Sequence, residues 1–132
     1  MSGDQKMIDL ARNFLMAMGD KKFEEGLSYL ADDCVYENMP MGMDAVTGPA
    51  AVRAVLEPFF GPTLANEFVF HREVASGSIV FIERTDRHKL AEDRWVELPV
   101  TGVFEIEDGK IKLWRDYFDL PTILTAWPEL AG

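Results

Sequence analysis

The sequence is poor in basic side chains and nearly devoid of cysteine. It carries 13 Lys and Arg against 23 Asp and Glu, which gives a formal net charge of −10 at pH 7. This balance argues against nucleic acid and anionic membrane surfaces as partners, because Lys and Arg are the side chains that neutralise phosphates. The single cysteine, Cys34, excludes an internal disulfide framework and is typical of a reducing compartment.

Several segments and motifs are also missing. No apolar run approaches the roughly 18 residues of a membrane span, and the first six residues do not lead into the apolar core of a signal peptide. We therefore expect a cytoplasmic protein without membrane contact. The chain has no phosphate-binding loop and no nucleophile elbow, and its His, Cys and Glu residues lack metal-ligand spacing, so we predict no metal site.

What is present is the composition of one globular domain. The 132 residues are 48% hydrophobic and 27% charged, and a chain of this length can build a core without metal or disulfide cross-links. We therefore expect a single domain over residues 1–132.

The apolar spacing changes once along the chain, from a helical to a strand period. Spacings of three and four predict a helix over Lys6–Met18, a shorter helix capped by Asp20, and a third helix opened by Gly48-Pro49. A short strand, Cys34–Asn38, interrupts the helices. Alternation then predicts four long strands: Glu67–Ala75, Ser78–His88, Arg94–Glu107 and Lys110–Phe118.

This order of elements predicts an α+β fold. It resembles the cystatin-like, NTF2-type cone, in which a curved, mixed but mostly antiparallel sheet and three to four helices enclose an apolar pocket. An Asp108-Gly109 hairpin turn joins the last two long strands, and the segment after Pro121 adds a final short helix.

Charged side chains interrupt the apolar face of one predicted strand. Val80 and Ile82 share that face with Arg84, Asp86 and His88. Buried charges cost several kcal/mol unless they are paired, and Arg84 and Asp86 are close enough along the strand to pair. The pattern fits either a structural ion pair at the sheet rim or groups that carry chemistry, and His88 fits either a pocket wall or the surface.

A second carboxylate, Asp116, lies between Trp114 and Phe118 on one face of the last strand. Desolvation raises the pKa of a carboxyl group and a nearby Arg lowers it, so two carboxylates around one Arg can hold different protonation states. Paired acid and base catalysis requires such a difference. Tyr36 and Asn38 share one face of the earlier short strand, where they could hold a water or be ordinary strand polarity.

Three segments, at these positions on this fold, resemble the limonene-1,2-epoxide hydrolases. They are Tyr36-Glu37-Asn38, Glu83-Arg84-Thr85-Asp86 and the run from Trp114 to Leu120. The resemblance extends from the first helix to about Leu120. It implies a cofactor-free, one-step hydration of an epoxide, without a covalent intermediate.

The resemblance also implies a role for each polar residue. Asp116 is the base that, with Tyr36 and Asn38, orients and deprotonates a water. Asp86 is the acid that protonates the epoxide oxygen, and Arg84 bridges the two carboxylates. The implied substrate is a small apolar epoxide, cyclic or terpenoid, and the product is a vicinal diol.

A substrate of low polarity requires an apolar pocket. The candidate lining residues are Leu15, Met18, Phe59, Leu64, Val80, Ile82, His88, Leu98, Val100 and Phe118. The hairpin turn places Asp116 opposite Thr101, out of phase with the pocket-facing residues of the preceding strand. We therefore predict a β-bulge at Gly102, where a glycine allows the strand to slip by one residue.

Two other function classes fit the same fold. A ketosteroid-isomerase-like or polyketide-cyclase-like enzyme would use Asp116 as a carbon-proton base and would give Arg84 little reason to lie between two acids. A non-catalytic binding module for apolar ligands would keep the ion pair for structure alone. Contact of Arg84 with both carboxylates inside an apolar pocket favours the hydrolase. Bulky side chains on the outer sheet face, Trp95, Val103 and Phe81, together with the resemblance, predict a homodimer.

Overall fold

The computed structural model describes residues 3–131, and within this range the elements follow the predicted order with one addition, the two-residue strand β2, which the sequence did not predict. The helices are α1 (Gly3–Gly19), α2 (Phe23–Leu27), α3 (Pro49–Phe60) and α4 (Leu120–Ala126), followed by a 3-10 turn over Pro128–Ala131. The strands are β1 (Leu30–Asn38), β2 (Val46–Thr47), β3 (Ala65–Ser76), β4 (Ile79–Ala91), β5 (Arg94–Glu107) and β6 (Lys110–Tyr117).

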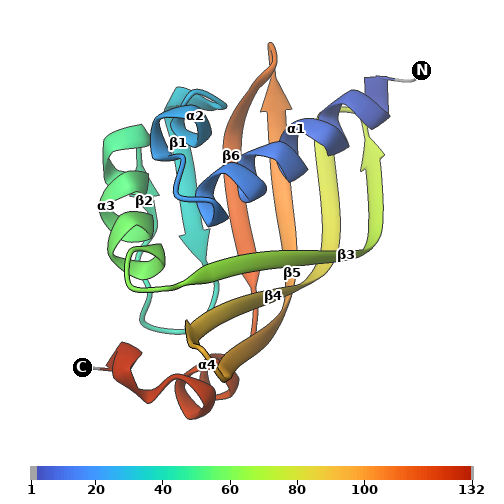
Figure 1. The fold of residues 1–132 in the computed structure, drawn as a ribbon. Helices are drawn as coiled ribbons and strands as arrows, with labels where there is room; N and C mark the ends of the chain where they lie inside the picture. Colours follow the sequence, from blue (N-terminus) through green and yellow to red (C-terminus); the bar gives the residue numbers. More distant parts are fainter. Residues whose placement is uncertain (1–2, 132) are drawn as a thin grey trace.

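All six strands form one curved sheet in the order β2-β1-β6-β5-β4-β3. Only β1 and β6 pair in parallel, so the sheet is mixed and mostly antiparallel, as predicted. Figure 1 shows β3 turning sharply halfway along its length and α1 lying across the sheet. The register of β3 against β4 shifts between Phe70 and Arg72, so His71 is an extra residue that bends β3 at this point.

The core has two parts, one on each side of the charged residues of β4. Residues at helical spacing on α1, including Phe14 and Leu15, pack with Phe104 and Trp114 of the sheet in the larger cluster. A smaller cluster joins β5 to α4 and the segment after it, through Val96, Leu98, Val100, Ile123 and Trp127.

The α2 region differs from the prediction. Helix α2 begins at Phe23 behind Lys22, which makes no side-chain cap, so the prediction that Asp20 caps this helix was wrong. Lys21 has a positive φ of 63°, and the chain therefore turns before α2 instead of entering it from Asp20. Strand β1 also starts earlier than predicted, at Leu30.

The predicted bulge exists in the sheet but on a different strand. Gly102 lies in an unbroken ladder, opposite Ile82 of β4 and Asp116 of β6, so the prediction of a bulge at Gly102 was wrong. Pairing of β5 with β6 shifts between Glu105 and Ile106, where Lys112 is the extra residue of β6. This insertion, close to the Asp108-Gly109 turn, makes the same phase correction and brings Asp116 onto the pocket-facing side.

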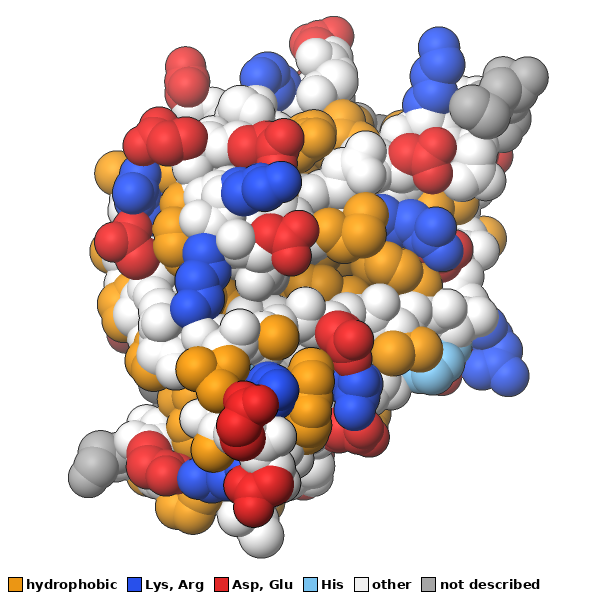
Figure 2. All heavy atoms as spheres, viewed as in Figure 1, with side chains coloured by type: hydrophobic (Ala, Val, Ile, Leu, Met, Phe, Trp, Pro, Cys, Tyr) orange, Lys and Arg blue, Asp and Glu red, His pale blue; other side chains and the backbone are white. Residues whose placement is uncertain are grey.

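The hairpin turn itself is as predicted, because Asp108 and Gly109 both have positive φ, 52° and 72°. Lys and Arg side chains are interspersed among Asp and Glu on the face shown in Figure 2, so the negative charge is not gathered into one patch there. No helix within residues 3–131 is long and apolar enough to cross a membrane.

Candidate active site

A cavity of about 260 Å³ lies among α1, α3, α4 and the sheet. Most of the predicted lining residues do line it: Leu15, Met18, Phe59, His88, Leu98, Val100 and Phe118. Other wall residues come from the helices, among them Leu56, Phe60 and Ile123. Sequence reasoning missed these because a helix's apolar stripe does not say which of its residues border empty space.

Three predicted lining residues lie elsewhere, so those predictions were wrong. Val80 and Ile82 share the inner face of β4 with the charged residues, but they are fully buried in the core cluster beneath α1. Leu64 lies just before β3 with its side chain 58% exposed, and its backbone N–H donates to the carbonyl of Lys89.

Arg84 lies between two carboxylates in the wall of this cavity. Its Nε donates to Asp86 Oδ1 (2.7 Å) and its Nη2 to Asp86 Oδ2 (3.2 Å). On its other side, Nη2 donates to Asp116 Oδ2 (2.8 Å) and Nη1 to Asp116 Oδ1 (3.2 Å). Exposure is 1% for Arg84, 8% for Asp86 and 6% for Asp116, so water screens this arrangement little.

The sheet register accounts for this contact. Arg84 and Asp116 approach across β5, where Gly102 is the direct partner of Asp116. A Cβ at Gly102 would lie 2.5 Å from Arg84 Nη1 and 2.8 Å from Asp116 Oδ1. The ion pair between Arg84 and Asp116 therefore occupies the space that a side chain at position 102 would fill. Sequence reasoning singled out this glycine but assigned it to a bulge.

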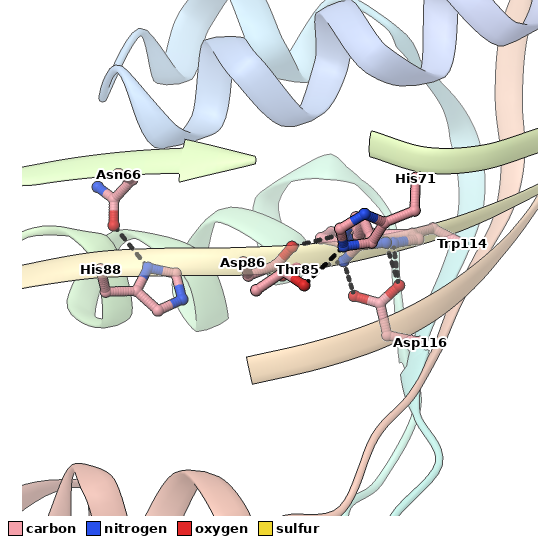
Figure 3. Close-up of polar contacts among 8 residues, drawn as sticks. Asn66, His71, Thr85, Asp86, His88, Trp114 and Asp116 are labelled. Atoms are coloured by element: carbon pink, nitrogen blue, oxygen red, sulfur yellow. Dashed lines mark hydrogen bonds and ion pairs between the residues drawn. The ribbon is translucent and has the colours of Figure 1, made fainter. Parts of the chain in front are cut away.

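Asp116 accepts a further hydrogen bond, from Trp114. The sequence predicted that Trp114 lies beside Asp116, but as part of an aromatic wall and not as a hydrogen-bond donor. Trp114 donates from Nε1 to Asp116 Oδ1 at 2.9 Å, as Figure 3 shows. The indole is held by Tyr36, whose ring stacks on it at 4.0 Å, and by the edge of Phe14 at 4.9 Å. Asp116 therefore accepts three N–H groups, from Arg84 and Trp114 together.

Tyr36 and Asn38 lie beside Asp116 on β1. Asn38 pairs with Asp116 in the parallel ladder, its Nδ2 donates to the Tyr36 hydroxyl at 2.9 Å, and both side chains line the cavity. The five polar residues singled out in the sequence are thus brought together at one wall of one cavity.

Burial and charge shift the pKa values of this cluster. Burial raises the pKa of Asp116, while Arg84 and the Trp114 N–H oppose that rise. Burial disfavours the charged guanidinium of Arg84, yet Asp116 and Asp86 outweigh it and the Arg84 pKa is raised. Burial, and then the charge of Asp116, also raise the pKa of Tyr36, so its hydroxyl stays protonated. Within residues 3–131, no group of three or more His, Cys, Asp or Glu could hold a metal ion.

Comparison with known proteins identifies the family. The limonene-1,2-epoxide hydrolase catalytic domain family matches residues 5–129. The epoxide hydrolase EphG of Mycobacterium tuberculosis (strain ATCC 25618 / H37Rv) is 39% identical over 107 residues, 81% of this chain and 69% of that protein. The structure of an M. tuberculosis LEH-like epoxide hydrolase has 33% identity and a TM-score of 0.79, over 97% of this chain and 93% of that one.

The fold is shared more widely. An NTF2-like protein of unknown function from Burkholderia pseudomallei K96243 superimposes with a TM-score of 0.79 at 19% identity, covering 96% of this chain and 98% of that one. At that identity the likeness shows the NTF2-like fold alone. The family match and the likeness to mycobacterial epoxide hydrolase show more: this chain belongs to the limonene-1,2-epoxide hydrolase family and is an epoxide hydrolase.

Proposed function

We propose that this enzyme adds water to a small apolar epoxide, cyclic or terpenoid, in one step and without a cofactor, giving a vicinal diol. The observation that carries the proposal is the single buried guanidinium of Arg84, which is hydrogen-bonded to both Asp86 and Asp116 in the wall of an apolar cavity. An ion pair kept for structure alone would need only one of the two carboxylates.

The two carboxylates have different surroundings, which supports different roles. Among residues 3–131, Asp116 accepts N–H groups from both Arg84 and Trp114, whereas Asp86 accepts side-chain N–H groups from Arg84 alone. Additional N–H donors favour the ionised form of a carboxyl group. We therefore assign the role of base to Asp116, where the N–H groups of Arg84 and Trp114 oppose the rise in pKa that burial causes, and the role of acid to Asp86.

The catalytic step then follows from the positions of the polar groups. A water held by Asp116, Asn38 and the Tyr36 hydroxyl loses a proton to Asp116 as its oxygen attacks an epoxide carbon. The bond between that carbon and the ring oxygen breaks, and Asp86 gives its proton to the departing oxygen. Each proton transfer contributes about 10²–10⁴-fold, and afterwards a proton returns from Asp116 to Asp86, directly or through water.

The rest of the cavity supports an apolar substrate of modest size. Its volume of about 260 Å³ lies just below the range of about 300–1,000 Å³ that is usual for small-molecule sites, so the substrate must be small. Apart from the five polar residues and His88, the wall residues are aliphatic, aromatic or Met side chains. Such a cavity stabilises a neutral ring by burying its carbon atoms and leaves the reacting water as its main hydrogen-bonding partner.

Diol formation from a panel of cyclic and terpene epoxides tests the proposal. We expect turnover by the native protein and its loss in both Asp116→Asn and Arg84→Gln, with each variant shown to be folded by circular dichroism. If the folded native protein opens none of these epoxides, the proposed substrate class is wrong. If Arg84→Gln stays fully active, the shared guanidinium has no part in the reaction.

We also propose that the enzyme is a cytoplasmic homodimer. The outer sheet face leaves Phe81 45% exposed and Val74 59% exposed. These residues pair across β3 and β4, so they form a continuous apolar surface that a second copy would cover. The free, buried thiol of Cys34 fits the reducing conditions of the cytoplasm.

A further inference from the structure

A buried histidine in the cavity wall has no part in the proposed mechanism. His88 is 2% exposed and follows Asp86 by two residues on the same face of β4. Its ring packs edge-on against Phe59 at 5.0 Å and lies 5.8 Å from the ring of Trp127. Packing against aromatic rings does not require the two ring nitrogens of His88, so their presence in this wall calls for a separate explanation.

A chain of hydrogen bonds fixes which ring nitrogen carries the proton. Thr63 donates its hydroxyl to the carbonyl of Phe60 (2.6 Å), so its oxygen is free to accept from Asn66 Nδ2 (2.8 Å). Asn66 Nδ2 also donates to the carbonyl of Gly19 (3.0 Å). The Asn66 oxygen must therefore face His88, and Nδ1 of His88 donates to it at 2.7 Å (Figure 3).

The other ring nitrogen is left as a free acceptor. Burial, and then the positive charge of Arg84, lower the pKa of His88 to about 4, so the ring is neutral at pH 7 and Nε2 carries a lone pair. No hydrogen bond reaches Nε2 from the part of the chain that the structure describes. In residues 3–131, every side-chain nitrogen or oxygen that is fully enclosed has a hydrogen-bond partner. Because Nε2 has none, it is not fully enclosed. His88 lines the cavity, so we infer that Nε2 faces the cavity.

We propose that Nε2 of His88 accepts a hydrogen bond from a hydroxyl group of the substrate, so that the preferred substrates are epoxides that also carry an alcohol. This inference rests on the proposed function and narrows its substrate class. Two residues along a strand span about 7 Å, so the hydroxyl lies roughly that far from the epoxide oxygen at Asp86. The ring carbons between the two groups lie against the apolar wall.

A hydrogen bond to Nε2 should make the enzyme prefer an epoxy alcohol over the corresponding ether. A neutral Nε2 accepts but cannot donate, so a hydroxyl group satisfies it and an ether oxygen does not. A site that is built to hydrogen-bond a substrate group discriminates strongly against the analogue that lacks it, because its own polar atom is left unpaired. We expect a cyclic epoxy alcohol to be preferred over its methyl ether by about 10-fold or more in kcat/KM.

Three variants test this preference with that pair of substrates. His88→Phe keeps an aromatic ring and should bring the alcohol-to-ether ratio of kcat/KM to about 1. His88→Gln returns an acceptor oxygen and should restore part of the preference. His71→Phe changes the other histidine, which is exposed and bonded to Thr85, and should leave the ratio at its native value. A native ratio near 1, or a ratio that survives His88→Phe, overturns the inference.

A binding measurement tests the hydrogen bond to His88 independently of whether the enzyme turns over an epoxide. The chain has two histidines, so ¹⁵N NMR resolves the ring nitrogens of His88 readily. We expect a non-protonated Nε2 at pH 7 whose resonance shifts when a saturated cyclic alcohol is added and stays in place with its methyl ether. A protonated Nε2, or equal shifts with both probes, contradicts the inference. Failure to turn over any epoxide would instead contradict the proposed function.

Discussion

Replacing Gly102 by alanine tests how closely the active-site geometry depends on the absence of one side chain. The added Cβ would lie 2.5 Å from Arg84 Nη1 and 2.8 Å from Asp116 Oδ1, whereas ordinary contacts of a Cβ begin near 3.4 Å. The guanidinium or the carboxylate must therefore move by about 1 Å. Arg84 is 1% exposed and is hydrogen-bonded to Asp86 on one side and Asp116 on the other, so a shift of its guanidinium lengthens or breaks some of these bonds.

The expected cost has two separable parts. Overpacking in a dense interior destabilises by about 1–3 kcal/mol, which chemical denaturation measures. A displacement of about 1 Å among reacting groups costs about 10²-fold in rate, and we expect it mainly in kcat, since the apolar walls that bind substrate are unchanged. Backbone strain does not contribute, because Gly102 does not have a positive φ.

Gly3→Ala is the matched control, because a Cβ at Gly3 meets nothing within 4 Å. It should leave both stability and kcat close to native values. The reasoning is refuted if Gly102→Ala retains a native kcat, because the space at Gly102 would then not position Arg84 and Asp116. If Gly102→Ala lowers the folded fraction, kcat is measured on the folded fraction alone, which separates the rate effect from the loss of stability.

Three further predictions follow from single contacts. Trp114→Phe keeps the stacked ring but removes the N–H donated to Asp116, so kcat should fall about 10-fold. Loss of this donor makes the ionised form of Asp116 less favourable, so the acidic limb of the pH–rate profile should move to higher pH. An acidic limb that does not move contradicts this prediction. Because the His88 pKa is lowered from 6.5 to about 4 in the folded state, the unfolded chain binds the extra proton. The free energy of unfolding should therefore fall by about 3 kcal/mol as pH drops from 6.5 to 4, and urea titrations should show no such loss in His88→Phe. Phe81→Glu adds charge to the exposed outer face and should convert a dimer to a monomer in sedimentation velocity; a native monomer contradicts the dimer proposal.

The sequence made the charged cluster predictable because strand periodicity is strict. Alternation along β4 and β6 assigns Arg84, Asp86 and Asp116 to inner faces without knowledge of the fold. For these side chains to come into contact, β4 and β6 need only lie on either side of β5. The family resemblance supplied that arrangement and also the roles of Tyr36 and Asn38.

The position of the bulge was not predictable in the same way. One extra residue anywhere between the Asp108-Gly109 turn and Asp116 makes the same phase correction, on either strand. In the structure Lys112 takes this place, next to the irregular pairing of β1 with β6, and its ammonium group contacts Asp33 of β1 at 2.8 Å. The position of the bulge therefore depends on contacts with β1, which is far from β6 in the sequence.

The cavity walls depend on how the helices dock, which the periodicity of a helix does not specify. Val80 and Ile82 have the same face and apolar character as true wall residues, yet α1 covers them. Which ring nitrogen of His88 carries the proton likewise depends on Asn66, its direct partner in the β3–β4 ladder. Nothing in the local sequence around His88 points to that partner.

The central claim is that Asp116 acts as a base on water and not as a nucleophile on the epoxide. A single turnover in H₂¹⁸O, with enzyme in excess over a cyclic epoxide, tests it directly by mass spectrometry of both product and protein. The account predicts one ¹⁸O atom in the first diol formed and none in the carboxylates of the protein. Unlabelled diol together with ¹⁸O in Asp116 or Asp86 would contradict it, since the oxygen would then have come from a covalent ester.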